Sequence, residues 1–330
     1  MSGVGLIFNP HAGRDVRRLV SAASSLTNYD RVNVARRVLV GLHAAGINNV
    51  WYLPDRYQLI ERAGASLPDM RLVPALETAT DTPDDTLQAT EAMIRAGVRV
   101  LVTHGGDGTN RLVAMRAGEV PILPLAAGTN NVFPSSAEAT AAGFAAGMLA
   151  SGAPPDRCVQ RHKCIRVETD ARADFALVDA AILRDEAVGS RAVWDAERVV
   201  ACMVTRSAPG AVGLSGFAGA LVTISPTEPC GAWVEMGHGT RVVALIAPGK
   251  ATTTEIRHLR KVAVGEKIEL GPLSGTVALD GERQLVLREQ KVSLSLDPGG
   301  PWVVDVVATL AWAQASGAFR VSPAATQAGS

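Results

Sequence analysis

The chain has few of the features that mark nucleic-acid-binding or membrane proteins. Aromatic residues make up 4% of its 330 residues, and 32 basic residues balance 32 acidic ones. No basic run or aromatic-studded stripe is present, although such a stripe is the usual footprint of a nucleic-acid-binding protein. No uncharged apolar run approaches the length that crosses a bilayer. We therefore predict a small-molecule partner, with no nucleic acid and no membrane.

Cysteine is scarce as well. The four cysteines, Cys158, Cys164, Cys202 and Cys230, form no CxxC pair, and His162 beside Cys164 supplies too few ligands for a metal site. The opening residues lead directly into an apolar run, without the basic region and long apolar core of a secretory signal. These patterns predict reduced thiols, no zinc site and a cytoplasmic location.

Short apolar runs alternate with helical patterns over the first half of the chain. This alternation predicts an α/β domain over residues 1–155, with a parallel sheet covered by helices on both faces. Ligands on such sheets bind at the carboxyl ends of the strands. The expected strands are residues 4–8, 49–53, 71–76, 99–103 and 121–125, and the expected helices are residues 32–45, 83–96 and 137–150.

The pattern changes after the Pro-Pro stretch at residues 154–155. Frequent turns and a weak helix signal predict a mainly antiparallel β-rich second domain over residues 156–323, which closes the cleft. Residues 324–330 are small and polar and are predicted to form a disordered tail. Strands are expected at residues 175–183, 199–205, 241–247, 267–270, 275–279, 284–287 and 291–296.

The most informative segment is His104-Gly105-Gly106-Asp107-Gly108-Thr109-Asn110, directly after an apolar strand. Its glycines permit positive φ and close backbone approach, so amide groups can face a polyphosphate at the start of the next helix. Gly-Asp-Gly is also ordinary turn chemistry. A bare acid among such amides would repel a phosphate unless it binds a metal or takes a proton. We therefore predict a phosphate-handling turn in which Asp107 has a chemical role.

Three further glycine-bearing turns also follow strands. Asn9-Pro10-His11-Ala12-Gly13-Arg14 closes the first strand, and Gly128-Thr129-Asn130-Asn131 offers hydrogen-bonding side chains after another. Asp280-Gly281-Glu282 lies between two strand-like runs of the second domain, where an Asp-Gly hairpin is the simpler interpretation. Each of these turns is a weak signal by itself.

Taken in order, the four segments resemble the superfamily that joins NAD kinases with diacylglycerol and sphingosine kinases. The likeness is greatest to the branch described as ATP-NAD kinase-like or acetoin-catabolism protein X, and it covers most of the chain. The resemblance implies an ATP-dependent kinase that phosphorylates a hydroxyl of a soluble small molecule, with ATP and Mg²⁺ as cofactors and NAD as the leading named acceptor. It is also compatible with a homodimer or tetramer.

The resemblance further implies roles for individual residues. Asp107 is predicted to be catalytic, because it would orient or deprotonate the acceptor hydroxyl, directly or through the water shell of a metal. Thr109 and Asn110 are expected to cap the helix, and Asp179, Asp280 and Glu282 to approach the cleft from the second domain. Mg²⁺ is expected to bind through the phosphates, with Asp107 as a candidate ligand. The predicted nucleotide- and phosphate-binding residues are Asn9, Gly13, Gly105, Gly106, Gly108, Thr109, Asn110, Gly128, Thr129, Asn130 and Asn131.

Other interpretations remain open at this stage. The stretch around Asp179 keeps an acid but lacks the asparagine of true NAD kinases, and residues 207–216 only loosely echo their next motif. A lipid kinase is one alternative, and a nucleotide-binding accessory protein of acetoin catabolism without turnover is another. The sequence does not decide whether His11 and His104 are structural or functional residues, and it assigns Asp81 to a solvated loop.

Overall fold

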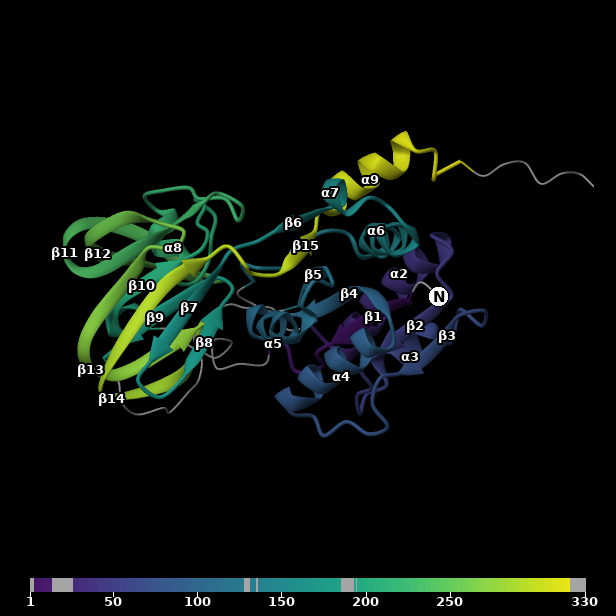
Figure 1. The fold of residues 1–330 in the computed structure, drawn as a ribbon, viewed down its shortest axis with the longest axis horizontal. Coiled ribbons are helices and arrows are strands. Elements are labelled where there is room, and N and C mark those ends of the chain that lie inside the picture. The colour runs from purple at the N-terminus through teal and green to yellow at the C-terminus, as the bar shows by residue number, and fades with distance from the viewer. Residues whose placement is uncertain are drawn as a thin grey trace, which may run out of the picture.

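The structure is a computed structural model that describes residues 3–13, 26–127, 131–134, 136–184, 193 and 195–320. Figure 1 shows two units side by side, a layered α/β unit and a unit of long antiparallel strands. The predicted fold class, an α/β N-terminal domain with a parallel sheet plus a mainly antiparallel β second domain, is confirmed.

The first domain is organised on one sheet. Its strands are β1 (Gly3–Phe8), β2 (Asn49–Tyr52), β3 (Arg71–Pro74), β4 (Val98–Gly105), β5 (Ile122–Ala126), β6 (Val159–Arg161) and β15 (Trp302–Val304). Their order is β3-β2-β1-β4-β5-β15-β6, and every neighbouring pair is parallel except β15 with β6. All six residues of β1 are buried, because helices cover both faces of the sheet.

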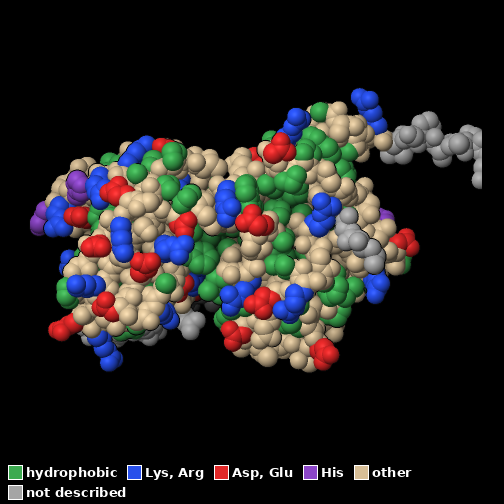
Figure 2. All heavy atoms as spheres, viewed as in Figure 1, with side chains coloured by type: hydrophobic (Ala, Val, Ile, Leu, Met, Phe, Trp, Pro, Cys, Tyr) green, Lys and Arg blue, Asp and Glu red, His purple; other side chains and the backbone are tan. Residues whose placement is uncertain are grey.

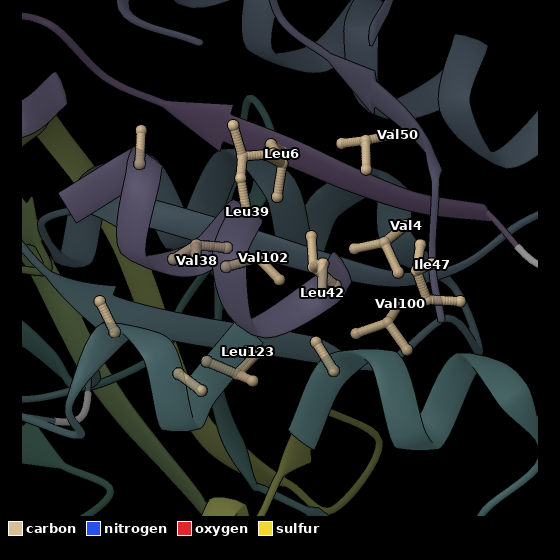
Figure 3. Close-up of a cluster of buried hydrophobic side chains, with 14 of the residues drawn as sticks. Val4, Leu6, Val38, Leu39, Leu42, Ile47, Val50, Val100, Val102 and Leu123 are labelled. Carbon is tan, nitrogen blue, oxygen red and sulfur yellow. The ribbon is translucent and has the colours of Figure 1, made fainter. Parts of the chain in front are cut away.

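Consecutive residues of β1 point to opposite faces, and each face has its own helices. Leu6 lies beside Leu39 of α2 (Figure 3) and shares an apolar cluster with side chains of α2, α3 and α6, whereas Ile7 shares a different cluster with side chains of α4 and α5. Thr27 and Asp30 form a capping box that begins α2, and Thr82 with Asp85 does the same for α4. The helices are α2 (Asn28–Ala44), α3 (Leu59–Gly64), α4 (Pro83–Arg95), α5 (Asp107–Ala117), α6 (Ala139–Ser151) and α7 (Pro155–Cys158).

The second domain is an eight-stranded antiparallel sheet in the order β12-β11-β10-β9-β13-β14-β7-β8. Its elements are β7 (Cys164–Thr169), β8 (Ala173–Ala176), β9 (Asp179–Leu183), η1 (Ala196–Arg198), β10 (Val199–Val204), α8 (Ser215–Gly219), β11 (Cys230–Ala247), β12 (Lys250–Ala263), β13 (Lys267–Leu279) and β14 (Glu282–Asp297). Separate apolar clusters cover its two faces. Phe217 and Ile224 are buried in one of them, so both belong to the core.

The chain returns to the first domain near its end. β15 pairs in parallel with β5 and antiparallel with β6, and α9 (Val306–Ala315) follows it and contacts α6 and α7. β6, β15 and α9 therefore complete the first sheet and its layer, whereas the sequence assigned all of residues 156–323 to the second domain. The reason is that β15 has three residues, and its partner β5 lies about 180 positions earlier in the chain, beyond the reach of local pattern.

Two features of the surface bear on possible partners. Among the described residues, no helix is both long and apolar enough to cross a membrane. Basic and acidic side chains are interspersed over the face seen in Figure 2, without a field of one sign. Residues 324–330 of the predicted tail lie outside the described residues.

Candidate active site

A cavity of about 480 Å³ lies where the carboxyl ends of the first-domain strands meet the β13–β14 turn of the second domain. This volume is in the range of small-molecule sites. The lining residues are Phe8, Asn9, Pro10, His11, Ala12, Gly13, Leu53, Pro54, Asp55, Asp81, Thr82, Pro83, Asp85, Thr86, Gly106, Asp107, Gly108, Thr109, Arg111, Leu112, Asn131, Asp280, Glu282 and Gln284.

Asp107 is the first residue of α5 and lines this cavity. Only 8% of the residue is exposed. Its Oδ1 accepts hydrogen bonds from the amides of Val132 and Phe133, at 3.2 and 2.9 Å. The carboxylate is thus held in place by the turn after β5, at the helix end where a negative charge is favoured.

The glycines beside Asp107 act through close approach. None of Gly105, Gly106 and Gly108 has a positive φ, so close approach is the one of the two properties named above that these glycines use. A Cβ at Gly105 would lie 2.6 Å from the Cβ of Thr109, closer than real Cβ atoms approach. A Cβ at Gly108 would lie 3.5 Å from Oε1 of Glu282, so the start of α5 borders the start of β14 across the domain junction.

The turn after β1 contacts the start of α5. Nδ2 of Asn9 donates to Oγ1 of Thr109 at 2.8 Å, and Oδ1 of Asn9 accepts from the amide of His11 at 2.8 Å. Gly13 has a φ of 73°, a conformation that favours glycine. Asn9, Gly13 and Thr109 all line the cavity, whereas Arg14 lies outside the described residues.

Asn110 does not belong to the cavity lining, and the expected cap is absent. The N-cap of α5 is Gly106, with no capping side-chain hydrogen bond. Asn110 is fully buried: its Nδ2 donates to the carbonyl of Gly106 at 2.9 Å, and its Oδ1 accepts from the hydroxyl of Thr103 on β4. The amide side chain therefore ties α5 to β4, and the phosphate-binding role of Asn110 stays a prediction that its position outside the cavity lining does not support.

The Gly/Asn-rich turn after β5 is described only in part. Gly128, Thr129 and Asn130 lie outside the described residues, whereas Asn131 lines the cavity. Its Oδ1 would lie 3.7 Å from a Cβ placed on Gly106. This turn and the start of α5 therefore face each other at the cavity wall.

Asp280 and Gly281 form a two-residue hairpin turn between β13 and β14, with φ values of 52° and 74°. Positive φ at both positions is typical of a type I′ turn, so the hairpin interpretation holds. Asp280 nevertheless lines the cavity. Its Oδ1 accepts from the amides of Leu177 and Val178, at 2.9 and 2.8 Å. Burial raises the pKa of this carboxyl to about 7, opposed by the positive charge of Arg111.

This pKa predicts a pH-dependent stability. A raised native pKa means that the folded chain holds a proton on Asp280 that the unfolded chain has lost, between about pH 4 and 7. The stabilisation that this proton gives to the folded state is therefore lost as the pH rises through that window. As the pH is raised from 5 to 8, the free energy of unfolding of the Asp280→Asn variant should increase by on the order of 3 kcal/mol relative to that of the parent. Urea unfolding of both proteins at the two pH values measures this difference, and parallel curves would contradict it.

Asparagine suits this test because it tolerates positive φ and keeps an oxygen for the amides of Leu177 and Val178. Comparison with the parent also cancels the other titrating groups. His104 and His162 are two of these, since burial lowers the pKa of each to about 3.

Asp179 and Glu282 occupy different places relative to the cavity. Oδ1 of Asp179 accepts from the amide of Gly281 at 3.1 Å, and the carbonyl of Asp179 accepts from the amide of Asp280. Asp179 does not line the main cavity and instead supports the hairpin turn. Glu282, the first residue of β14, does line it.

Two arginines missed at the sequence level lie at the domain junction. Arg111 follows Asp107 by four positions on α5, and this spacing places both on one helix face, the signal that could have revealed it. Arg206 follows β10 and stacks over the ring of Phe133, with its guanidinium carbon 5.1 Å from the ring centroid. Burial lowers the pKa of Arg206 to about 10, opposed by the charges of Asp107 and Asp280.

His104 and His11 differ in their position relative to the cavity. His104 is 1% exposed, its ring lies 4.9 Å from that of Phe8, and it does not line the cavity, so its place is structural. His11 lines the cavity, with Nε2 3.9 Å from Oδ1 of Asp81. Asp81 also lines the cavity, so its assignment to a solvated loop was incomplete.

The donor set bears on metal binding. Asp107, Asp280 and Glu282 present carboxylates, the oxygen ligands that Mg²⁺ prefers. Within the described part of the chain, however, no group of three or more His, Cys, Asp or Glu residues is close enough to hold a metal ion by itself. This arrangement fits Mg²⁺ that arrives with phosphates and takes only one or two protein carboxylates, the common mode for this ion.

Comparisons with known proteins divide the chain in the same way as the fold. The family described as ATP-NAD kinase N-terminal domain matches residues 4–152, and that described as acetoin catabolism protein X C-terminal domain matches residues 163–299. Acetoin catabolism protein X of Cupriavidus necator is 36% identical over 327 residues, covering 93% of this chain and 91% of that protein. Two solved chains from Bacillus anthracis str. Sterne, one described as a putative diacylglycerol kinase and one as a diacylglycerol kinase, cover 92% of this chain and 96% of their own, at 13% and 12% identity and TM-scores of 0.44 and 0.41.

Proposed function

The chain belongs to the family of acetoin catabolism protein X, and from this we propose that it is an ATP-dependent kinase that phosphorylates a hydroxyl group of a soluble small molecule. The match of its first half to the ATP-NAD kinase domain supports this proposal. The observation that carries it is the position of Asp107, which starts α5 at the wall of the cavity, one residue before the contact with Glu282.

Phosphoryl transfer needs positioning and charge neutralisation more than covalent chemistry. The first N–H groups of α5 lack carbonyl partners within the helix and suit the phosphates. Asp107 accepts the proton of the acceptor hydroxyl on its carboxylate, which the amides of Val132 and Phe133 hold in position. Bound Mg²⁺ supplies further charge neutralisation at the phosphates. One or two of the carboxylates of Asp107, Asp280 and Glu282 would hold it together with the phosphates.

NAD is the named candidate acceptor, and the composition of the cavity favours a soluble one. Polar and charged side chains make up much of the described lining, and its larger apolar side chains are Phe8, Leu53 and Leu112. An acyl chain needs a continuous apolar trough, which these residues alone do not supply. A soluble acceptor therefore fits this lining better than a diacylglycerol.

A nucleotide-binding accessory protein of acetoin catabolism without turnover is the second candidate. The observation that favours it is the engagement of Asp107, whose carboxylate accepts bonds from two backbone amides and so also serves to hold a turn. The name of the Cupriavidus necator relative, which specifies a pathway and no reaction, is compatible with either candidate.

A kinase assay with γ-labelled ATP, Mg²⁺ and a library of soluble metabolites tests the proposal. We expect label to move to one hydroxyl compound, and formation of NADP would identify NAD as that compound. Thermal-shift measurements with MgATP run alongside. Stabilisation by MgATP without transfer to any compound would favour the accessory protein, and absence of both effects would contradict both candidates.

A further inference from the structure

Arg111 is the point at which α5 makes ion pairs with the second domain. Its Nη1 lies 3.2 Å from Oδ1 of Asp174 on β8, and its Nε lies 3.6 Å from Oδ2 of Asp280 in the β13–β14 turn. The side chains of Arg111, Asp174 and Asp280 are 7%, 15% and 0% exposed, so solvent screens their charges weakly. One first-domain side chain therefore contacts two separate elements of the second domain.

Arg111 also stands out by charge. It is the one lysine or arginine among the described residues that line the cavity, whereas six carboxylates line it. Those acids are Asp55, Asp81, Asp85, Asp107, Asp280 and Glu282. Removing one partner of a buried ion pair leaves an uncompensated charge, which is strongly unfavourable. Loss of Arg111 would remove the ion pair of Asp280 and leave only the more distant charge of Arg206 to offset the surrounding acids.

The hairpin geometry connects this ion pair to the cavity wall. The turn has only two residues, and Leu279 pairs directly with Glu282 across it. A displacement of Asp280 must therefore move Glu282, which borders the start of α5 at Gly108. Asp280 also accepts hydrogen bonds from the amides of Leu177 and Val178, so the turn is held both by the segment between β8 and β9 and by Arg111.

We propose that Arg111 is a positioning residue that docks the β13–β14 turn on α5 and so keeps Glu282 beside Gly108. The proposal concerns the site assigned above and rests on the proposed function for its catalytic consequence. Its structural part, the docking of the turn, does not depend on which reaction the site performs.

Hydrogen exchange followed by mass spectrometry tests the docking on the full chain. The reporters are the peptides with the amides of Leu177, Val178 and Gly281, which donate to Asp280 and Asp179. We expect exchange there to become about tenfold faster in Arg111→Met, to return toward the parent in Arg111→Lys, and to quicken in Asp174→Asn. Far-UV circular dichroism checks that each variant is folded.

Arg116→Met is the matched control. Arg116 lies on the same helix and pairs with Glu91 at 2.6 Å, but 43% of its side chain is exposed and it does not line the cavity. This variant should exchange like the parent at all reporter amides. If Arg111→Met exchanges like Arg116→Met, Arg111 does not position the turn.

MgATP binding by calorimetry distinguishes failure here from failure of the proposed function. Weakened MgATP binding with parent-like exchange in Arg111→Met would make Arg111 a phosphate ligand and contradict docking. If exchange is faster in Arg111→Met and the parent protein itself binds no MgATP, docking is supported and the kinase assignment is contradicted.

Discussion

Asp107→Asn is expected to lower transfer of the γ-phosphate by a factor of about 10²–10⁴, the usual contribution of a general base. Asparagine cannot accept a proton from a hydroxyl at neutral pH. It keeps one oxygen that can accept from the amides of Val132 and Phe133, so the turn after β5 should stay in place. The measurement is the rate of label transfer from γ-labelled ATP to the acceptor found in the library assay, with folding checked by circular dichroism.

Asp81→Asn is the matched control for this prediction. Asp81 is also an aspartate of the cavity lining, but its carboxylate lies 3.2 Å from Nε of Arg56 and far along the chain from the glycine turn. We expect this variant to keep its rate within about threefold of the parent. If Asp107→Asn turns over as fast as Asp81→Asn, the carboxylate holds the turn and takes no part in proton transfer.

The second large effect is expected at the crossing of α2 and α6, where Gly143→Ala should destabilise the protein. A Cβ on Gly143 would lie 2.2 Å from the carbonyl oxygen of Val38, and one on Gly41 would lie 2.1 Å from the carbonyl oxygen of Thr140. These contacts join backbone to backbone, so no side-chain rotation relieves them. The helix-propensity gain of alanine, about 1 kcal/mol, is smaller than the cost of separating two packed helices.

We expect a net loss of about 3 kcal/mol, at the upper end of overpacking effects, and a fall in Tm of roughly 6–12 °C for a domain of this size. Calorimetry or guanidinium unfolding measures it. Gly210→Ala provides the comparison, because a Cβ there meets no atom within 4 Å and its φ is not positive. A Gly143→Ala protein as stable as Gly210→Ala would show that the helices can separate at little cost.

Local pattern was sufficient for much of the first domain. The expected strand at residues 99–103 lies within β4 (Val98–Gly105), and the expected helix at residues 83–96 coincides with α4 (Pro83–Arg95). Strands buried on both faces need continuous apolar runs, and α4 has a capping box, so both signals are contained in a few neighbouring residues. β12, by contrast, was missed because it is an edge strand rich in charge and threonine, with few buried apolar residues.

The candidate site divides along the same line. The glycine turns can be recognised in the sequence, and the structure brings their described parts to one cavity. The burial of Asn110, on the side of α5 that meets β4, could not be predicted from the sequence, because it depends on a hydrogen bond from Thr103 on the preceding strand. The double character of Asp280, both hairpin residue and cavity carboxylate, likewise depends on amides about 100 residues away.

By itself, the sequence determined the α/β and antiparallel β classes of the two domains and the strand–turn–helix around Asp107, because apolar periodicity and glycine spacing act over short stretches of chain. Only the tertiary structure decided that β15 and α9 return to the first domain, that Arg111 pairs with Asp174 and Asp280, and that Glu282 borders Gly108. These contacts join residues tens to hundreds of positions apart, and their energies depend on burial and distance, which exist only once the two domains have packed together.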